Sequence, residues 1–232
     1  MRVMPPIYVI AGLLIPARSP AQGSHADHAV HEAMAGEMAE NPHMRMTPSR
    51  PRSAADSARA RAIADTVRRV LAKYADPAAA EADGYRLFLP NIKSQKVFHY
   101  TSWKHAVQEA FRFDPTAPTS ILYKKDARGT MKLVGAMYTM PKRSSPEELD
   151  ARVPTSVATW HLHTNLCIPA RDEARRYADQ QQGKPLFGLN GSIVTKQACD
   201  AENGRFLPTV FGWMVHANVF EGTDLATVWA HH

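Results

Sequence analysis

Two histidines separated by one residue occur in an apolar stretch of the chain, Trp160-His161-Leu162-His163. Successive side chains of a β-strand point to opposite faces, so His161 and His163 would share one face. Imidazolium rings this close repel each other, whereas neutral rings can be buried together on one metal ion. The pattern therefore indicates a metal site, and two separately hydrogen-bonded core histidines are the alternative.

Two further histidines occur in apolar segments that also have the character of strands. His216 ends the segment Phe211-Gly212-Trp213-Met214-Val215-His216, and His99 lies between Phe98 and Tyr100. Three histidines with an open coordination position are common at zinc, copper and iron centres. We expect His161, His163 and His216 to hold one metal ion, with His99 as a candidate fourth ligand.

An enzyme could use the same three histidines, but the sequence assigns no catalytic residue. The chain has no GxSxG or HExxH motif and no pair of carboxylates near these histidines. Glu109 and Asp224 could orient imidazoles, and surface positions are the alternative. A substrate pocket could be lined by aromatic side chains: Tyr100, Tyr138, Trp160 and Trp213.

A second group of candidate ligands lies near the N-terminus, in residues 25–46. Its four histidines and four methionines are His25, His28, His31, Met34, Met38, His43, Met44 and Met46. Imidazole suits Cu(II) and thioether suits Cu(I), so the segment is expected to capture copper. Its composition resembles the His/Met-rich tails of bacterial copper-handling proteins, and an Ala-rich linker is the alternative. The terminal pair His231-His232 could add a weak pair of ligands.

The chain begins like an exported protein. Residues 1–21 combine Arg2, an apolar stretch from Ile7 to Ile15, and small residues at Ser19 and Ala21. We expect a signal peptide over 1–21 and a periplasmic or secreted location, with an uncleaved anchor as the alternative. The two cysteines, Cys167 and Cys199, would then form a disulfide. Cys167 lies four residues after His163, so a metal thiolate is the competing interpretation.

Composition excludes several other classes. The net charge of +6 is too small to favour nucleic acid without a basic face. No stretch is apolar for long enough to span a membrane, so we expect no stable insertion after signal removal. The 44% apolar content suffices for a core.

The expected organisation is α+β. Residues 22–53 are rich in Gly, Pro, Ser and Ala and predict a disordered tail. Ser53 to Asp56 predicts a helix start, and 54–84 predicts two helices. Residues 85–232 predict a β-rich metal-binding domain, with strands over 121–125, 130–140, 156–166 and 211–220 and short helices from 102, 145 and 195. We expect a small antiparallel β-sandwich or a cupin-like barrel with an N-terminal helical lead.

Two resemblances support these expectations. The His161-x-His163 pair with the later His216 is similar to the cupin metal pattern, although no Glu follows at cupin spacing. Residues 74–220 resemble a group of exported bacterial proteins of unassigned activity. The shared motifs are Asp83-Gly84-Tyr85, Phe98-His99-Tyr100 and a hairpin spanning Pro118 to Tyr123 and Leu133 to Tyr138. That group often has Glu where this chain has Met137, which implies a soft ligand or a core residue here.

The sequence thus leaves three functions open. The first is an exported copper-binding protein for homeostasis or delivery, with a three-histidine core site and a capture tail. The second is a mononuclear copper, iron or zinc enzyme that uses the same site. The third is a structural exported domain without metal. We expect copper as the bound ion, with zinc or iron as alternatives.

Overall fold

The computed structural model describes residues 41–90 and 95–231. The expected signal peptide and most of the expected tail, including His25, His28, His31, Met34 and Met38, lie outside these residues. The helices described are α2 (Ala54–Leu71), α3 (Pro77–Ala82), α4 (Trp103–Glu109), α5 (Pro146–Arg152), α6 (Lys196–Ala201) and α7 (Leu225–Val228). The strands described are β1 (Met44–Met46), β2 (Arg86–Leu87), β3 (Phe98–Thr101), β4 (Ser120–Lys125), β5 (Met131–Met140), β6 (His161–Ile168), β7 (Gln180–Gln181), β8 (Lys184–Pro185) and β9 (Arg205–Ala217).

The fold is α+β, and it is built on one open antiparallel sheet. Its seven strands run in the order β1-β6-β9-β5-β4-β3-β2, and β7 and β8 form a separate pair. The expected cupin-like barrel or sandwich is not confirmed, because β1 and β2 stand at opposite edges of the sheet. Both edge strands are very short, which leaves few backbone groups free to pair with another chain.

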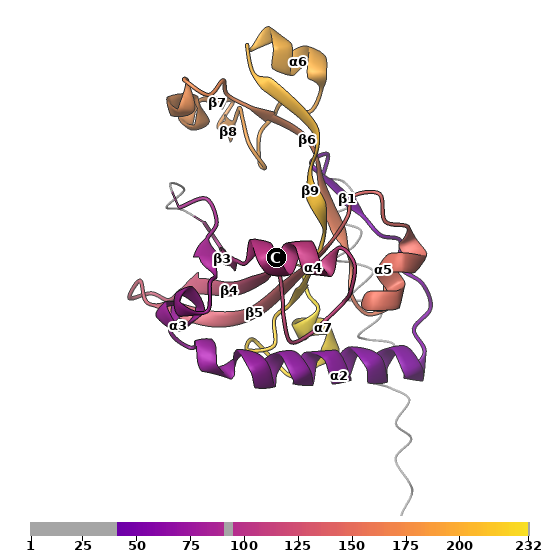
Figure 1. Cartoon of the computed structure of the whole chain (residues 1–232). Helices are drawn as coiled ribbons and strands as arrows, with labels where there is room; N and C mark the ends of the chain where they lie inside the picture. Colours follow the sequence, from indigo (N-terminus) through magenta and orange to yellow (C-terminus); the bar gives the residue numbers. More distant parts are fainter. Residues whose placement is uncertain (1–40, 91–94, 232) are drawn as a thin grey trace, which may run out of the picture.

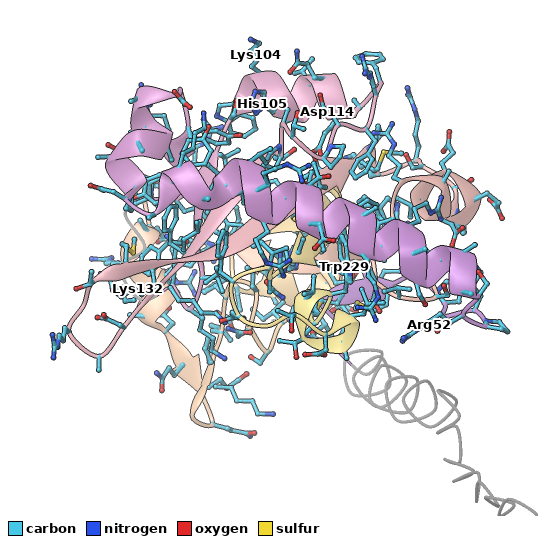
Figure 2. All side chains as sticks on the ribbon, turned by 90° about the horizontal axis from the view of Figure 1, so that it is seen from below. Arg52, Lys104, His105, Asp114, Lys132 and Trp229 are labelled. Carbon is cyan, nitrogen blue, oxygen red and sulfur yellow. A yellow bond between two sulfur atoms is a disulfide. The ribbon has the colours of Figure 1, made fainter. Side chains whose placement is uncertain are left out.

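Helix α2 covers one face of this sheet. Ser53 and Asp56 form the expected capping box at its start. Its buried residues Ile63, Val67 and Leu71 belong to one large apolar cluster with side chains from β3, β4, β5 and β9. Figure 1 shows α2 beneath the sheet, and Figure 2, from the α2 side, shows Trp229 beside that helix. The hydrophobic core lies on this face. Every second side chain of a strand points to the same face, and those that point toward α2 are apolar.

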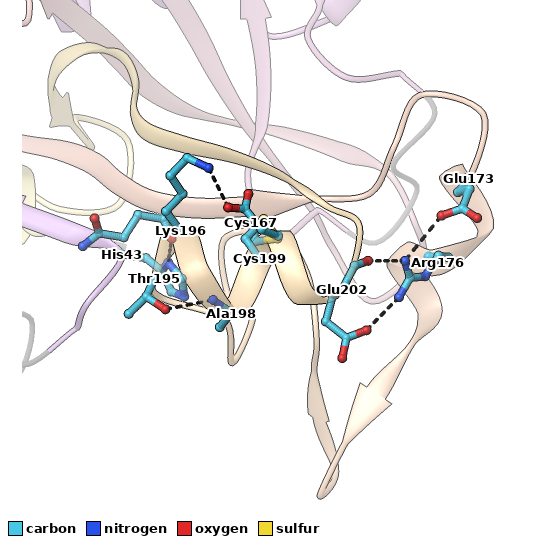
Figure 3. The surroundings of a disulfide bond; sticks show 11 residues. His43, Cys167, Glu173, Arg176, Thr195, Lys196, Ala198, Cys199 and Glu202 are labelled. Carbon is cyan, nitrogen blue, oxygen red and sulfur yellow. Dashed lines mark hydrogen bonds and ion pairs between the residues drawn. A yellow bond between two sulfur atoms is a disulfide. The ribbon is translucent and has the colours of Figure 1, made fainter.

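Strands β6 and β9 extend beyond the other strands and carry a smaller unit, which we call the distal lobe (residues 169–204). Figure 1 shows α6, β7 and β8 at the end of these strands, away from α2. Cys167 and Cys199 form the expected disulfide at the base of the distal lobe, so the thiolate interpretation of Cys167 is wrong. Arg176 adds ion pairs to Glu173 and Glu202 in the same lobe (Figure 3).

Three segments differ from the expectation. Residues 41–53 do not belong to a disordered tail, because Met44–Met46 pairs with β6 as an edge strand. The strand expected from Ser156 begins only at His161, since the carbonyl of Pro154 accepts hydrogen bonds from Val157 and Ala158 in a turn. Strand β9 begins six residues before the expected Phe211, because Pro208 interrupts the pattern without ending the strand.

Candidate functional site

The sheet register brings three of the expected metal ligands to one face. His161 lies opposite Met214 of β9, and Met137 of β5 lies opposite His216. Residues directly opposite in neighbouring strands share a face, as do residues two apart in one strand. The centroid of the His161 ring is therefore 5.2 Å from that of His216 and 5.5 Å from that of His163.

Two more histidines join this group, which we call the imidazole cluster (His99, His161, His163, His216 and His231). The ring of His99, the candidate fourth ligand, lies 5.8 Å from that of His216. The His231 ring lies 4.1 Å from that of His161 and 5.7 Å from that of His216. The sequence indicated only a weak pair of ligands at His231-His232, yet the His231 ring makes the shortest ring contact of the cluster.

The C-terminal segment reaches the cluster because it is held against the end of β9. The backbone N–H of Asn218 donates to the carbonyl of Val228 at 2.6 Å. The side-chain amide of Asn218 donates to the carbonyl of Ala230 at 2.7 Å. Strand β6 begins opposite Met214, so the last residues of β9 have no β6 partner beside them. This arrangement brings His231 next to His161.

Burial favours the neutral form of the His161 and His163 imidazoles. His161 is only 2% exposed and His216 only 8%. Burial is the main reason that the pKa of His161 lies well below that of free imidazole, and the neighbouring histidines lower it further. Burial also lowers the pKa of His163. Neutral imidazole is the form that binds metal ions.

Two buried nitrogen atoms of the cluster make no hydrogen bond to the described residues. Among the described residues, Nδ1 of His161 and Nδ1 of His163 have no hydrogen-bond partner. A buried polar atom without a partner costs on the order of 1–3 kcal/mol. A bound metal ion would remove this cost, because it accepts the nitrogen lone pair directly.

The distances between the ring centroids fit a metal centre, but the donor nitrogens are not placed around one common point. With metal–nitrogen bonds of about 2.0–2.1 Å, rings around a tetrahedral ion have centroids about 5 Å apart. However, no group of three His, Cys, Asp or Glu within residues 41–90 and 95–231 has donor atoms placed to hold an ion. The planes of His161 and His163 cross at 82°, and those of His161 and His216 at 70°. The donor set therefore fits a metal ion only if the rings turn about their side-chain bonds.

Three residues of the expected capture tail lie within the described part of the chain: His43, Met44 and Met46. They make different contacts. Both ring nitrogens of His43 contact carbonyl oxygens, Nδ1 that of Asn165 at 3.1 Å and Nε2 that of Gly191 at 2.6 Å. His43 thus joins the segment before β1 to β6 and the distal lobe (Figure 3), and it is not part of the imidazole cluster. Met44 and Met46, in contrast, lie directly opposite His163 and His161.

The aromatic side chains suggested for a substrate pocket lie elsewhere. Tyr100, Tyr138, Trp160 and Trp213 belong to the apolar cluster that packs against α2, on the other face of the sheet from the histidines. The expectation that they line a pocket at the metal site is therefore wrong. A strand exposes alternate residues to opposite faces, and Tyr138 alternates with Met137 and Tyr100 with His99.

The two carboxylates considered for orienting imidazoles make other contacts. Glu109 accepts hydrogen bonds from the backbone N–H and the hydroxyl of Thr139 and from the hydroxyl of Thr119. Asp224 caps α7 through the backbone N–H of Thr227. Both therefore stabilise the fold around the site.

Comparison with known proteins gives no identification: no protein-family model, no curated protein and no solved structure matches the chain. Interpretation of the imidazole cluster therefore depends on its own chemistry.

Proposed function

We propose that this chain is an exported metal-binding protein that holds one copper ion in the imidazole cluster through His161, His163 and His216. The observation that carries the proposal is a group of closely spaced imidazoles from separate strands, of which His161 and His216 are buried. The tail histidines and methionines would capture copper before it reaches this site. The bound ion would serve copper homeostasis or delivery in the periplasm or outside the cell.

One structural finding supports an oxidising location: the Cys167–Cys199 disulfide is typical of exported proteins. Within the described part of the chain, no helix has both the length and the apolar character needed to cross a membrane. The signal peptide over 1–21 and the resemblance to exported bacterial proteins remain predictions.

Burial of the cluster supports binding rather than catalysis. A metalloenzyme based on the same histidines needs a coordination position that a substrate can enter. His161 and His216 are almost inaccessible, which suits retention of an ion. Azide added to the Cu(II)-loaded protein separates the two functions: an unchanged electron paramagnetic resonance spectrum favours the binding protein, and a perturbed one favours the enzyme.

The metal content of purified protein tests the proposal. The tail should first be silenced in the full chain by replacing His25, His28 and His31 with Ala and Met34 and Met38 with Leu. This protein should retain about one copper ion per chain after dialysis, because the core site is intact. Adding His161→Ala and His163→Ala should abolish the retained copper, as measured by elemental analysis.

A matched control is His105→Ala, because His105 lies outside the cluster and contacts Tyr85 and Pro118. It should leave the copper content unchanged. Equal copper content in the tail-silenced protein and in its His161→Ala/His163→Ala variant would overturn the core site.

A further inference from the structure

Methionines lie directly across from three histidines of the cluster, His161, His163 and His216. His161 of β6 has Met46 of β1 opposite it on one side and Met214 of β9 on the other. His216 has Met137 of β5 opposite it. Side chains directly opposite in antiparallel strands have Cβ atoms about 4.5–5.5 Å apart. The thioethers and the imidazoles therefore line one face of the sheet side by side.

Two of these methionines, Met137 and Met214, are buried, whereas Met46 is half-buried. Met137 is 7% exposed and Met214 is 6% exposed, and both belong to a small apolar cluster with Leu122 and Val134. This cluster is separate from the main core, which lies on the α2 face. A ligand beside Met137 and Met214 would thus contact sulfur, imidazole and aliphatic groups.

The chemistry of this layer selects a soft ion of low charge. Thioether sulfur carries no charge and binds Cu(I), whereas Zn²⁺ and Cu(II) prefer nitrogen, oxygen or thiolate ligands. Neutral ligands in a buried site also stabilise a monovalent ion better than a divalent one, since less charge is removed from water. A site with both thioether and imidazole ligands needs fewer imidazoles. This agrees with the finding that no three His, Cys, Asp or Glu side chains among the described residues are placed to hold an ion.

We propose that the thioethers of Met46 and Met214 add to the imidazole ligands of this site beside His161 and make it selective for Cu(I), with Met137 next to His216 on the same face. This inference rests on the proposed function and specifies the oxidation state and the sulfur ligands of the same site. It also gives the end of the expected tail a role in the core, because Met46 reaches the site as part of β1.

The test uses leucine in place of methionine, because this exchange removes the sulfur and nearly conserves the volume. In the tail-silenced full chain, Cu(I) affinity is measured by competition with a chromophoric Cu(I) chelator, and Ag(I) serves as a probe without redox chemistry. Met46→Leu/Met214→Leu should weaken Cu(I) and Ag(I) binding by at least about 10-fold, since removing even an indirect partner of a metal ligand costs about 10–100-fold. Binding of Cu(II) should change less.

The matched control is Met140→Leu. Met140 is as buried as Met214, but it belongs to the main core on the α2 face. It should leave the affinity for Cu(I) unchanged. A second readout does not depend on any variant: Ag(I) should shift the NMR signals of the Met46 and Met214 ε-methyl groups in the tail-silenced protein and leave that of Met140 in place.

The outcomes distinguish the two proposals. If Cu(I) affinity is lost in His161→Ala but unchanged in Met46→Leu/Met214→Leu, and the ε-methyl signals do not move, the thioether ligands are refuted and the copper site stands. Zn²⁺ binding as tight as Cu(I) binding would overturn the selectivity. If neither Cu(I) nor Cu(II) binds once the tail is silenced, the proposed function fails, and the thioether site fails with it.

Discussion

Glu109 is the most unusual single residue outside the imidazole cluster. It is a carboxylic acid on α4 that is buried almost completely, and burial raises its pKa to about 8. Hydrogen bonds from Thr119 and Thr139 favour the ionised form and only partly offset the cost of burial. The folded protein therefore keeps this acid protonated at a pH where the unfolded chain ionises it.

This difference predicts a pH-dependent stability. Between about pH 4.5 and 8 the folded state holds a proton on Glu109 that the unfolded state has lost, so the free energy of unfolding should fall as pH rises, by up to about 1.4 kcal/mol per pH unit. Glu109→Gln cannot ionise and should remove this slope. Urea unfolding of both proteins at pH 5, 6.5 and 8 measures the difference.

Glu81→Gln is a suitable control, because Glu81 is exposed on α3. Its stability should follow that of the wild type at each pH. A constant difference in the free energy of unfolding between wild type and Glu109→Gln across this range would show that Glu109 is ionised in the folded state.

At the scale of elements, one arginine connects three parts of the chain. Arg50, which follows β1, donates to Asp56 at the start of α2 and to Asp150 of α5. The same bonds hold the pKa of Asp56 far below its usual range and lower that of Asp150 to about 2. Arg50 thus fixes the path by which β1, with Met46, joins the sheet.

Removing this side chain should loosen the start of α2. Arg50→Met leaves Asp56 and Asp150 as buried or half-buried carboxylates without their shared partner, and it should lower the free energy of unfolding by about 1–3 kcal/mol. Arg61→Met, an exposed substitution on the same helix, is the control and should have little effect. Thermal or urea unfolding at pH 7 compares the two, and equal stability would contradict the role of Arg50.

At the scale of the whole molecule, the distal lobe depends on the disulfide more than the sheet does. Its own apolar cluster is small and includes Phe187, Ile193 and both cysteines. The sheet below it has the larger core against α2. The distal lobe therefore has few apolar contacts of its own, and we expect it to open more easily than the sheet.

Reduction of the disulfide should act mainly on this lobe. The bond joins residues 32 positions apart, and a loop of that length contributes about 3–4 kcal/mol in the chain-entropy model. Cys167→Ala/Cys199→Ala should lower the free energy of unfolding by about this amount. Hydrogen exchange should accelerate in residues 169–204 and stay slow in β4 and β5. Uniform acceleration over the whole sheet would contradict the separation of the lobe from the core.

Local patterns predicted several elements correctly, because the interactions behind them are close in sequence. The capping box at Ser53, the short helix after Ser145 and the hairpin of β4 and β5 all form as expected. Helix α4 shows where such reasoning fails. Trp103 and Val107 of this helix and Phe111 just after it are exposed, with Phe111 at 84%, whereas the acidic residue Glu109 is buried.

The sequence by itself determined which chemical groups the protein can use: strand histidines at alternating positions, a His/Met-rich segment and a single pair of cysteines. Alternation along β6 was enough to place His161 and His163 together, because it is a local property of a strand. Only the tertiary structure decided that Met46, Met214 and His231 lie beside them. Those contacts depend on strand register and on the path of the C-terminus, which join residues far apart in the chain and leave no local pattern.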